Sequence, residues 1–277
     1  MKDTLLPILI EPADLVDKLN DPRLLIVDLS YRGSYDSAHV PGAIRLDYPS
    51  ILHPHDNTDC DIPSNEVLSR SLSAIGLTPD HHVVVYDGQG NPMACRLFWT
   101  LEELGHTAVS VINGGWAAWK SEGLPAEQKP NTPQSSNYQA RRTGKVLATK
   151  EYILGKIGDP NTVFLDSRSP EEFTNELIIT DRGGKIPGSV HFDWLSSVDE
   201  EKDMRLRPKE DILRALHHLG ATPDKGIIPY CQTHMRSSHT YFVLKHLGYQ
   251  NILGYAAGYS EWGNETDTPV ENEQKAA

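Results

Sequence analysis

Cysteine is scarce in this chain of 277 residues, and the three present, Cys60, Cys95 and Cys231, lack metal-ligand spacing such as C-x-x-C. An odd number of thiols in that arrangement argues against a disulfide framework or a structural zinc site, and it favours a reducing compartment. No segment approaches the roughly 20 apolar residues of a membrane span. The N-terminal MKDTLLPILIEP lacks the small-residue cleavage site of a signal peptide. We therefore expect a cytoplasmic protein that does not enter membranes.

Basic residues are fewer than acidic ones, 26 Lys and Arg against 38 Asp and Glu, so the formal net charge is −12. Such a surface repels polyanions, so general binding to nucleic acid or to an anionic membrane is not expected, although a local pocket can still attract a small anion. The glycine-containing stretch DGQG at 87–90 is too short for either phosphate-binding fingerprint. The sequence thus predicts no organic cofactor and no metal.

What the chain does contain is an internal repeat. GLTPD at 76–80, followed by HHVVVYD, matches GATPD at 220–224, followed by KGIIPYC, at an offset of 144. Further on, Leu104-Gly105 matches Leu247-Gly248 at an offset of 143. HVPGAIRLD likewise resembles KIPGSVHFD, and the runs LLIVD and TVFLD precede these segments. We expect three parts: an N-terminal domain at 1–125, a connector rich in Pro, Ser, Asn and Gln at 126–145, and a C-terminal domain at 146–277.

In each copy, short runs rich in Val and Ile alternate with stretches of helical period. Buried runs between helices are typical of parallel strands joined by right-handed crossovers. The sequence therefore predicts an α/β fold of two similar tandem domains, each a mainly parallel sheet flanked by helices. In such sheets ligands bind at the carboxyl ends of strands, where loops lead into helices. Cys231 lies at such a place, after the run GIIPY.

The segment CQTHMRS at 231–237 has to turn the chain from that strand into a helix. Free amides at a helix start and the helix dipole create positive potential, and a thiol there ionises more easily. Arg236 adds a fixed charge, while His234 is either a second charge or a neutral hydrogen-bonding residue. The arrangement predicts a nucleophilic thiolate in an anion-binding loop.

A lone cysteine at the end of a buried strand is more often a small core residue. The repeat favours the reactive interpretation, because Asp87 stands at the equivalent position and an acidic side chain does not fill an apolar niche. We expect the first copy to lack the nucleophile and to be inactive. Cys95, on the helix that follows, is expected to be a packing residue.

From Cys231 to Arg236 the loop has the spacing C-x4-R, one residue shorter than the C-x5-R loop of cysteine-type phosphatases. A smaller ring suits one sulfur atom carried as a persulfide better than a phosphoryl group with its oxygens. The change of the repeat offset from 144 to 143 falls between this position and the following helix. We expect the loop of the second copy to be the shorter by one residue.

The repeated Asp…(Ile/Val)-Pro-Gly-(Ala/Ser) segments, the ends GGWAAW and AGYSEW and the six-residue loop together resemble the tandem-domain rhodaneses, the thiosulfate:cyanide sulfurtransferases. The resemblance implies that Cys231 takes the outer sulfur of thiosulfate as a persulfide, that sulfite leaves, and that the sulfur passes to cyanide or another thiophile. The loop CQTHMR is similar to that of a bacterial branch with CQTHHR, and it differs from the CRKGVT and CGSGVT loops of other thiosulfate and mercaptopyruvate enzymes. The loop residues expected to contact substrate are Gln232, Thr233, His234, Met235, Arg236 and Ser237.

Other candidates are weaker. Arg168 follows a strand that ends at Asp166, and a structural ion pair between the two is favoured over substrate contact. Trp194 is expected to line the wall of the site or an interface. The histidine-rich HPHD at 53–56 with Cys60 fits no zinc pattern, so a surface loop is the better interpretation.

Three functions stay open at this point: a sulfurtransferase using thiosulfate or mercaptopyruvate, a phosphatase or arsenate reductase, and a carrier that holds a persulfide for a protein acceptor. The expected partners are a small sulfur donor and a thiophilic acceptor such as cyanide or a thiol. A monomer is expected, because two domains can form a cleft without a partner.

Overall fold

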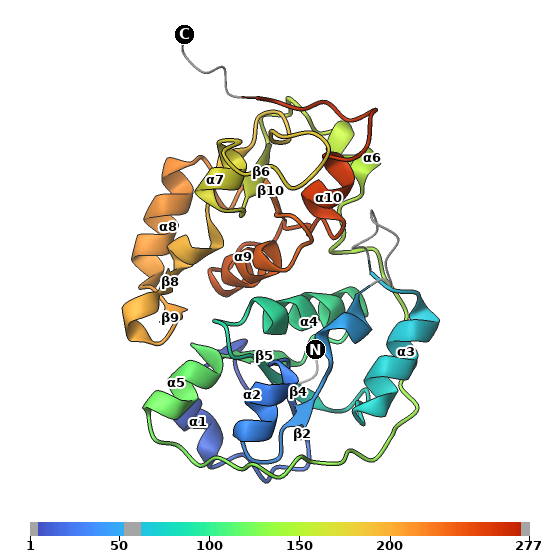
Figure 1. Ribbon diagram of the computed structural model, residues 1–277, viewed down its shortest axis with the longest axis vertical. Helices are drawn as coiled ribbons and strands as arrows, with labels where there is room; N and C mark the ends of the chain where they lie inside the picture. The colour runs from blue at the N-terminus through green and yellow to red at the C-terminus, as the bar shows by residue number, and fades with distance from the viewer. Residues whose placement is uncertain (1–4, 53–61, 273–277) are drawn as a thin grey trace. The chain divides into compact units, whose positions relative to one another are not determined.

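The computed structural model describes residues 5–52 and 62–272, which fall into two compact units. The first unit holds residues 5–52, 62–144 and 198–206, and the second holds residues 145–197 and 207–272. Each unit contains a parallel sheet flanked by helices (Figure 1). The predicted α/β class with two similar tandem domains is confirmed.

The sheet of the first unit has five parallel strands in the order β1-β5-β4-β2-β3. Its central strands are buried along almost their whole length, because crossover helices cover the sheet. The strands are β1 (Leu9–Ile10), β2 (Leu24–Asp28), β3 (Ile44–Arg45), β4 (His82–Tyr86) and β5 (Val109–Ile112). The helices are α1 (Pro12–Val16), α2 (Arg32–Ser37), the 3₁₀ helix η1 (Tyr48–Ile51), α3 (Asn65–Ala74), α4 (Pro92–Glu103) and α5 (Gly115–Ser121).

The second unit has a parallel sheet in the order β10-β6-β7. Two parallel bridges, Leu147 with Gly254 and Ile227 with Ile252, extend the pairing beyond these strands. The strands are β6 (Thr162–Asp166), β7 (Val190–His191) and β10 (Gly226–Tyr230). The helices are α6 (Lys150–Leu154), α7 (Pro170–Phe173), the 3₁₀ helix η2 (Trp194–Ser197), α8 (Lys209–His218), α9 (Arg236–His246) and α10 (Gly258–Trp262).

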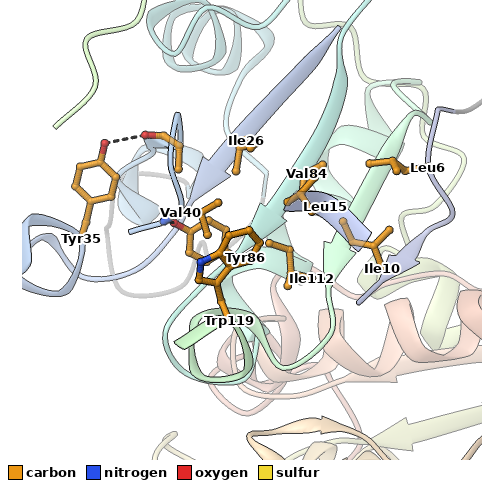
Figure 2. Close-up of a cluster of buried hydrophobic side chains, with 11 residues drawn as sticks. Leu6, Ile10, Leu15, Ile26, Tyr35, Val40, Val84, Tyr86, Ile112 and Trp119 are labelled. Atoms are coloured by element: carbon orange, nitrogen blue, oxygen red, sulfur yellow. Dashed lines mark hydrogen bonds between the residues drawn. The ribbon is translucent and has the colours of Figure 1, made fainter. Parts of the chain in front are cut away.

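The two hydrophobic cores repeat the same anchors. Trp119 in the first unit and Trp262 in the second are both fully buried, and each indole N–H donates to a proline carbonyl at 2.8 Å. Tyr86 (Figure 2) and Tyr230 are buried at equivalent places. In both units the tyrosine hydroxyl accepts the backbone N–H of the residue before the repeated Pro-Gly pair. The sequence repeat is therefore a repeat of packing.

Segment 126–144, expected to be a connector, is held along the first unit. The backbone N–H groups of Ser136 and Tyr138 donate to the carbonyl and the hydroxyl of Ser73 on α3, both at 2.9 Å. Ala140 donates to the hydroxyl of Ser69 at 2.9 Å. This stretch is held by hydrogen bonds from its backbone N–H groups. Such bonds need no regular spacing of apolar residues, so the sequence shows no hydrophobic period here.

A short antiparallel hairpin from the second half of the chain also lies in the first unit. It consists of β8 (Val198–Asp199), the 3₁₀ helix η3 (Glu200–Lys202) and β9 (Arg205–Leu206). The guanidinium of Arg205 pairs with the carboxylates of Glu11 and Glu122, and the amide of Leu206 donates to Asn113 Oδ1 at 2.9 Å. The boundary between the two units therefore does not fall at a single point in the sequence.

Candidate active site

Cys231 lies directly after β10, and α9 begins five residues later at Arg236. β10 runs parallel to β6, with Tyr230 opposite Asp166, so the residues after both strands leave the same edge of the sheet. The cysteine side chain is nearly enclosed, with 1% exposed. This position at the carboxyl end of a parallel strand is the one that the hydrophobic runs predict.

A left-handed residue closes the loop. His234 has φ 58°, and Met235 already has helical angles of φ −80° and ψ −56°. Histidine is among the few non-glycine residues enriched in this region.

In the first unit two residues of the equivalent loop are left-handed, Gly90 (φ 83°) and Asn91 (φ 74°). α4 begins at Pro92, five positions after Asp87, just as α9 begins five positions after Cys231. The two loops therefore have the same length up to the helix start, and the prediction of a loop shorter by one residue is wrong. The change of offset falls within the helix instead, since α4 has 12 residues and α9 has 11.

A glycine allows α10 to approach this loop closely. Gly258 has φ 61°, and a Cβ placed on it would lie 2.5 Å from the carbonyl oxygens of both Cys231 and Gln232. These two carbonyls accept the backbone N–H groups of Tyr259 at 2.8 Å and Ser260 at 3.0 Å. Only glycine fits such a contact at a positive φ. The start of α10 therefore fixes the backbone beneath the thiol.

Side chains of the loop bond within the loop and to α10. Gln232, Thr233 and Met235 are half-buried, whereas His234 is fully buried. His234 Nδ1 lies 2.7 Å from Ser237 Oγ, and the Gln232 amide donates to the Ser260 hydroxyl at 3.2 Å. These contacts hold the shape of the loop around Cys231.

The pKa of the Cys231 thiol lies below its ordinary value of 9.0, although the group is buried. Burial has the largest effect and by itself raises the pKa, because an apolar surrounding disfavours the thiolate. The charge of Arg236, hydrogen bonds from the side chain and amide of Ser237, and the amide of Thr233 lower the pKa and together outweigh burial. Groups of its own loop therefore stabilise the thiolate, as a cysteine nucleophile requires.

Arg236 is held by a carboxylate on α7. Its Nη1 lies 2.5 Å from Glu172 Oε2 and its Nη2 lies 2.9 Å from Oε1, a bidentate pair. The Glu172 side chain is 4% exposed and that of Arg236 is 21% exposed. Although burial lowers the pKa of Arg236, hydrogen bonds to Glu172 and the proximity of Cys231 raise it overall. The guanidinium is therefore charged and shared between the thiol and a buried acid.

Glu172 was not among the residues that the sequence singled out. Two signals point to it in retrospect. It forms a capping box with Ser169 at the start of α7, and the S-x-x-E spacing is typical of that motif. It also lies six residues after the strand-end Asp166, whereas the residue six positions after the equivalent Asp28 is Ser34. Like the nucleophile, this acid occurs in one copy alone.

The matching loop of the first unit is filled by its own anion. The carboxylate of Asp87 is fully buried and accepts four backbone N–H groups, those of Gln89 (2.7 Å), Asn91 (2.9 Å), Met93 (2.9 Å) and Ala94 (3.0 Å). Gly115, at φ 58°, would place a Cβ 2.5 Å from the Asp87 carbonyl, the same close approach as in the second unit. Cys95 is buried inside α4. The first loop thus keeps the anion-binding geometry without a thiol.

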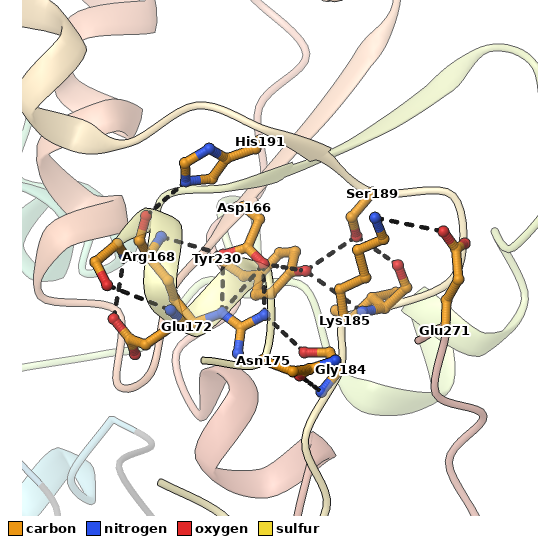
Figure 3. A network of polar contacts seen from close by, with 12 residues as sticks. Asp166, Arg168, Glu172, Asn175, Gly184, Lys185, Ser189, His191, Tyr230 and Glu271 are labelled. Carbon is orange, nitrogen blue, oxygen red and sulfur yellow. Dashed lines mark hydrogen bonds and ion pairs between the residues drawn. The ribbon is translucent and has the colours of Figure 1, made fainter. Parts of the chain in front are cut away.

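Arg168 is 3% exposed and turned toward the strand end (Figure 3). Its Nε lies 2.9 Å from Asp166 Oδ1, and its Nη2 lies 2.6 Å from Oδ2 and 2.8 Å from the Gly184 carbonyl. The guanidinium carbon lies 4.1 Å from the centroid of the Tyr259 ring. These contacts are those of a structural ion pair, the interpretation that the sequence favoured over substrate contact.

Trp194 begins η2 and is half-buried. Its ring meets the ring of His239 edge-on, with centroids 5.3 Å apart. His239 is three residues into α9, and burial lowers its pKa to about 4. The structure therefore places Trp194 against α9, the helix that follows the loop of Cys231.

Within residues 5–52 and 62–272, no group of three or more His, Cys, Asp or Glu side chains is placed to hold a metal ion. The HPHD segment at 53–56 and Cys60 lie outside the described residues. No helix in the described part of the chain has both the length and the apolar character needed to cross a bilayer.

Comparisons with known proteins agree with this geometry. The rhodanese-like domain family matches the chain twice, at residues 11–122 and 149–265. The chain is 37% identical over 266 residues to a thiosulfate sulfurtransferase of Azotobacter vinelandii, covering 96% of this chain and 97% of that protein. It is 31% identical to the sulfur carrier protein TtuD of Thermus thermophilus, covering 92% and 93%. The crystal structure of YnjE has the same fold, with a TM-score of 0.84 at 20% identity over 97% of this chain and 69% of YnjE. The chain therefore belongs to the rhodanese-like domain family, of which it holds two tandem copies.

Proposed function

We propose that the protein is a sulfurtransferase that moves a sulfane sulfur from thiosulfate, through a Cys231 persulfide, to cyanide or another thiophilic acceptor. The observation that carries the proposal is the buried Cys231 thiol whose pKa is lowered by Arg236 and by its own loop. The relative from A. vinelandii, which aligns with nearly the whole chain, is named a thiosulfate sulfurtransferase and supports the same donor.

The reaction proceeds in two displacements. The Cys231 thiolate attacks the outer sulfur of thiosulfate, a bond forms between Sγ and that sulfur, and sulfite leaves with the electron pair of the broken sulfur–sulfur bond. Cyanide then attacks the terminal sulfur of the persulfide, thiocyanate is released and Sγ leaves as the thiolate. The protein is neither oxidised nor reduced over the complete cycle.

The loop supplies the charge stabilisation for both steps. Amides from Gln232 to Ser237 stabilise negative charge on the thiolate and then on the terminal persulfide sulfur. Arg236 has five N–H donors and gives two N–H contacts to Glu172. Its remaining donors bind the sulfonate end of thiosulfate. The buried Asp87 carboxylate, with its four amide donors, supports this role, because the sister loop accepts an anion in the same way.

Two alternatives keep the same thiol chemistry and change the partners. In one, 3-mercaptopyruvate is the donor. In the other, Cys231 holds its persulfide for a protein acceptor, and the relative named a sulfur carrier protein favours that possibility. In each case we place the protein in the cytoplasm as a monomer, acting on small sulfur compounds and without a cofactor.

The test is the intact mass of the purified protein before and after adding thiosulfate and then cyanide, with a Cys231→Ser variant as the control. We expect a gain of one sulfur atom, about 32 Da, that cyanide removes and that the variant never shows. A gain from mercaptopyruvate alone would select the other donor. No gain from either donor, or hydrolysis of an aryl phosphate, would refute the sulfurtransferase.

A further inference from the structure

The catalytic copy contains an insertion that the first copy lacks. Asp28 and Gly42 are 14 residues apart, whereas their equivalents Asp166 and Gly188 are 22 residues apart, eight more. Phe173, like its aromatic counterpart in the first copy, lies seven residues after the aspartate. The extra residues therefore fall after α7. Loops on a fixed scaffold are frequent sites of binding function.

This insertion exposes three consecutive large apolar side chains. Leu177, Ile178 and Ile179 are 49%, 55% and 59% exposed. In the part of the chain that the structure describes, the other exposed large apolar side chains are Tyr31 (62%) and Tyr152 (44%), which occur singly. Scattered apolar residues are normal on a surface, but a contiguous group marks an interaction site. We call Leu177–Ile179 the apolar patch.

The patch is displayed by an ordered loop. Asn175 has φ 64°, and its side-chain oxygen accepts the amide of Gly184. Arg168 Nη2 donates to the Gly184 carbonyl at 2.8 Å, so the buried ion pair also fixes the far end of the insertion (Figure 3). Arg182 donates to the carbonyls of Trp262 and Thr268, both at 2.8 Å. A surface held in one conformation loses little entropy when a partner binds.

A series of contacts links the patch to the loop of Cys231. The amide of Leu177 donates to the carbonyl of Glu171 at 2.9 Å. The next residue, Glu172, holds Arg236 in the bidentate pair, and Arg236 in turn interacts with Cys231. The insertion that carries the patch is therefore joined, through α7 and Glu172, to the residue that stabilises the Cys231 thiolate.

The exposed charges beside the patch have one sign. Glu171, Glu176 and Asp181 are exposed, whereas Arg182, within the insertion, is half-buried and bonded to backbone carbonyls. The net charge of the whole chain is −12. Complementary charge favours a partner whose apolar contact surface is edged by lysine and arginine.

We propose that the apolar patch docks a protein that carries the sulfur-accepting thiol, through an apolar surface edged by basic residues. The inference rests on the proposed persulfide function and assigns it a protein acceptor. In the transfer, the acceptor thiolate attacks the terminal sulfur of the Cys231 persulfide. The bond between Sγ and that sulfur breaks, Cys231 leaves as the thiolate, and the acceptor becomes the persulfide.

The test uses full-length protein loaded with sulfur and two thiols. One is a synthetic peptide with leucine and phenylalanine flanked by lysines and a terminal cysteine on a glycine–serine spacer, and the other is glutathione. The variant is Leu177→Ser/Ile178→Ser/Ile179→Ser. Tyr31→Ser, which removes a single side chain that is 62% exposed, is the matched control. We expect the triple variant to lower the transfer rate to the peptide by about tenfold. Transfer to glutathione and to cyanide stays unchanged, and Tyr31→Ser changes none of the three rates.

Equal peptide rates in the parent and the triple variant would overturn the docking proposal while leaving the persulfide function standing. A parent that sediments as a dimer, with a monomeric triple variant, would also overturn it, because the patch would then join two copies of this chain. If the parent forms no persulfide with any donor, the proposed function fails, and the docking proposal fails with it. A peptide in which glutamate replaces lysine should accept sulfur more slowly than the lysine peptide, and the opposite order would refute the charge argument.

Discussion

Replacing Arg236 by methionine should separate the two effects of its guanidinium, one on the stability of the fold and one on the thiol. The change keeps much of the volume and removes the charge. It leaves the Glu172 carboxylate, 4% exposed, without its bidentate partner. Breaking a buried pair from one side costs about 3 to 5 kcal/mol, and because Arg236 is 21% exposed we expect the lower end, about 3 kcal/mol. Urea unfolding measures this loss.

The same variant should raise the pKa of Cys231. Burial already opposes ionisation of this thiol, and Arg236 is the first of the groups that overcome it. An opposite charge within reach lowers a pKa by about one to three units, so its removal should shift the thiol titration upward by at least about one unit. Once the pKa lies above the pH of the assay, each further unit decreases the thiolate by about tenfold, and persulfide formation should slow accordingly. Ultraviolet absorbance of the thiolate and the rate of mass gain report the two effects.

A double variant, Glu172→Gln with Arg236→Met, separates the effect of Arg236 on fold stability from its effect on the Cys231 pKa. Because glutamine carries no charge, the double variant has no unpaired buried carboxylate at position 172. It should therefore recover most of the lost stability, while the pKa of Cys231 stays raised. The pKa of Glu172 is lowered from 4.5 despite burial, through its hydrogen bonds and attraction to Arg236. An acid with a lowered folded pKa adds stability above its unfolded pKa, and that stability is lost as the pH falls through the folded value. The stability gap between the parent and Arg236→Met should therefore close below about pH 4.5.

Two results would refute this reasoning. If the single and double variants unfold at the same urea concentration, the ion pair is not the source of the lost stability. If the thiol of Arg236→Met titrates at the pH of the parent, Arg236 does not set the Cys231 pKa.

Two further changes use the repeat as its own control. Gly258→Ala and Gly115→Ala each force a side chain into a left-handed position 2.5 Å from a carbonyl oxygen, so both should lose at least about 1 to 2 kcal/mol of stability. Only Gly258→Ala should slow persulfide formation, by about tenfold or more, because it displaces Cys231; equal slowing in both would contradict the assignment of chemistry to the second copy. Asp87→Asn places a side-chain NH2 group opposite backbone N–H groups, so two donors face each other. The free energy of unfolding, measured in urea, should fall by about 2 kcal/mol, while the folded protein still forms the persulfide. An unchanged unfolding midpoint would show that the four amides do not depend on the carboxylate.

Local patterns were enough to place the thiol. The run GIIPY ends at the residue where β10 ends, and Gly248, a residue type typical of helix ends, follows the C-terminal cap of α9 at φ 92°. These features depend on neighbouring residues and on the period of strands and helices, which a sequence displays directly.

Long-range partners were out of reach. Glu172 and Arg236 are 64 residues apart, and no period or composition links them. The hairpin around Arg205 lies with the first unit although it belongs to the second half of the chain, because its partners Glu11 and Glu122 are there. Segment 126–144 is ordered by its backbone N–H groups, whose acceptors include the hydroxyls of Ser69 and Ser73 on a distant helix, so its own sequence carries no sign of this order.

The sequence by itself determined that the chain is two copies of one α/β unit and that one copy has a cysteine in a short loop before a helix. It also identified Arg236 as the charge near that cysteine. The tertiary structure alone decided how this charge is shared between Cys231 and a buried carboxylate, and whether the amides of the loop outweigh the burial of the thiol. The physical reason is that desolvation and Coulomb attraction depend on distances and burial between elements, whereas a sequence gives only the spacing along the chain.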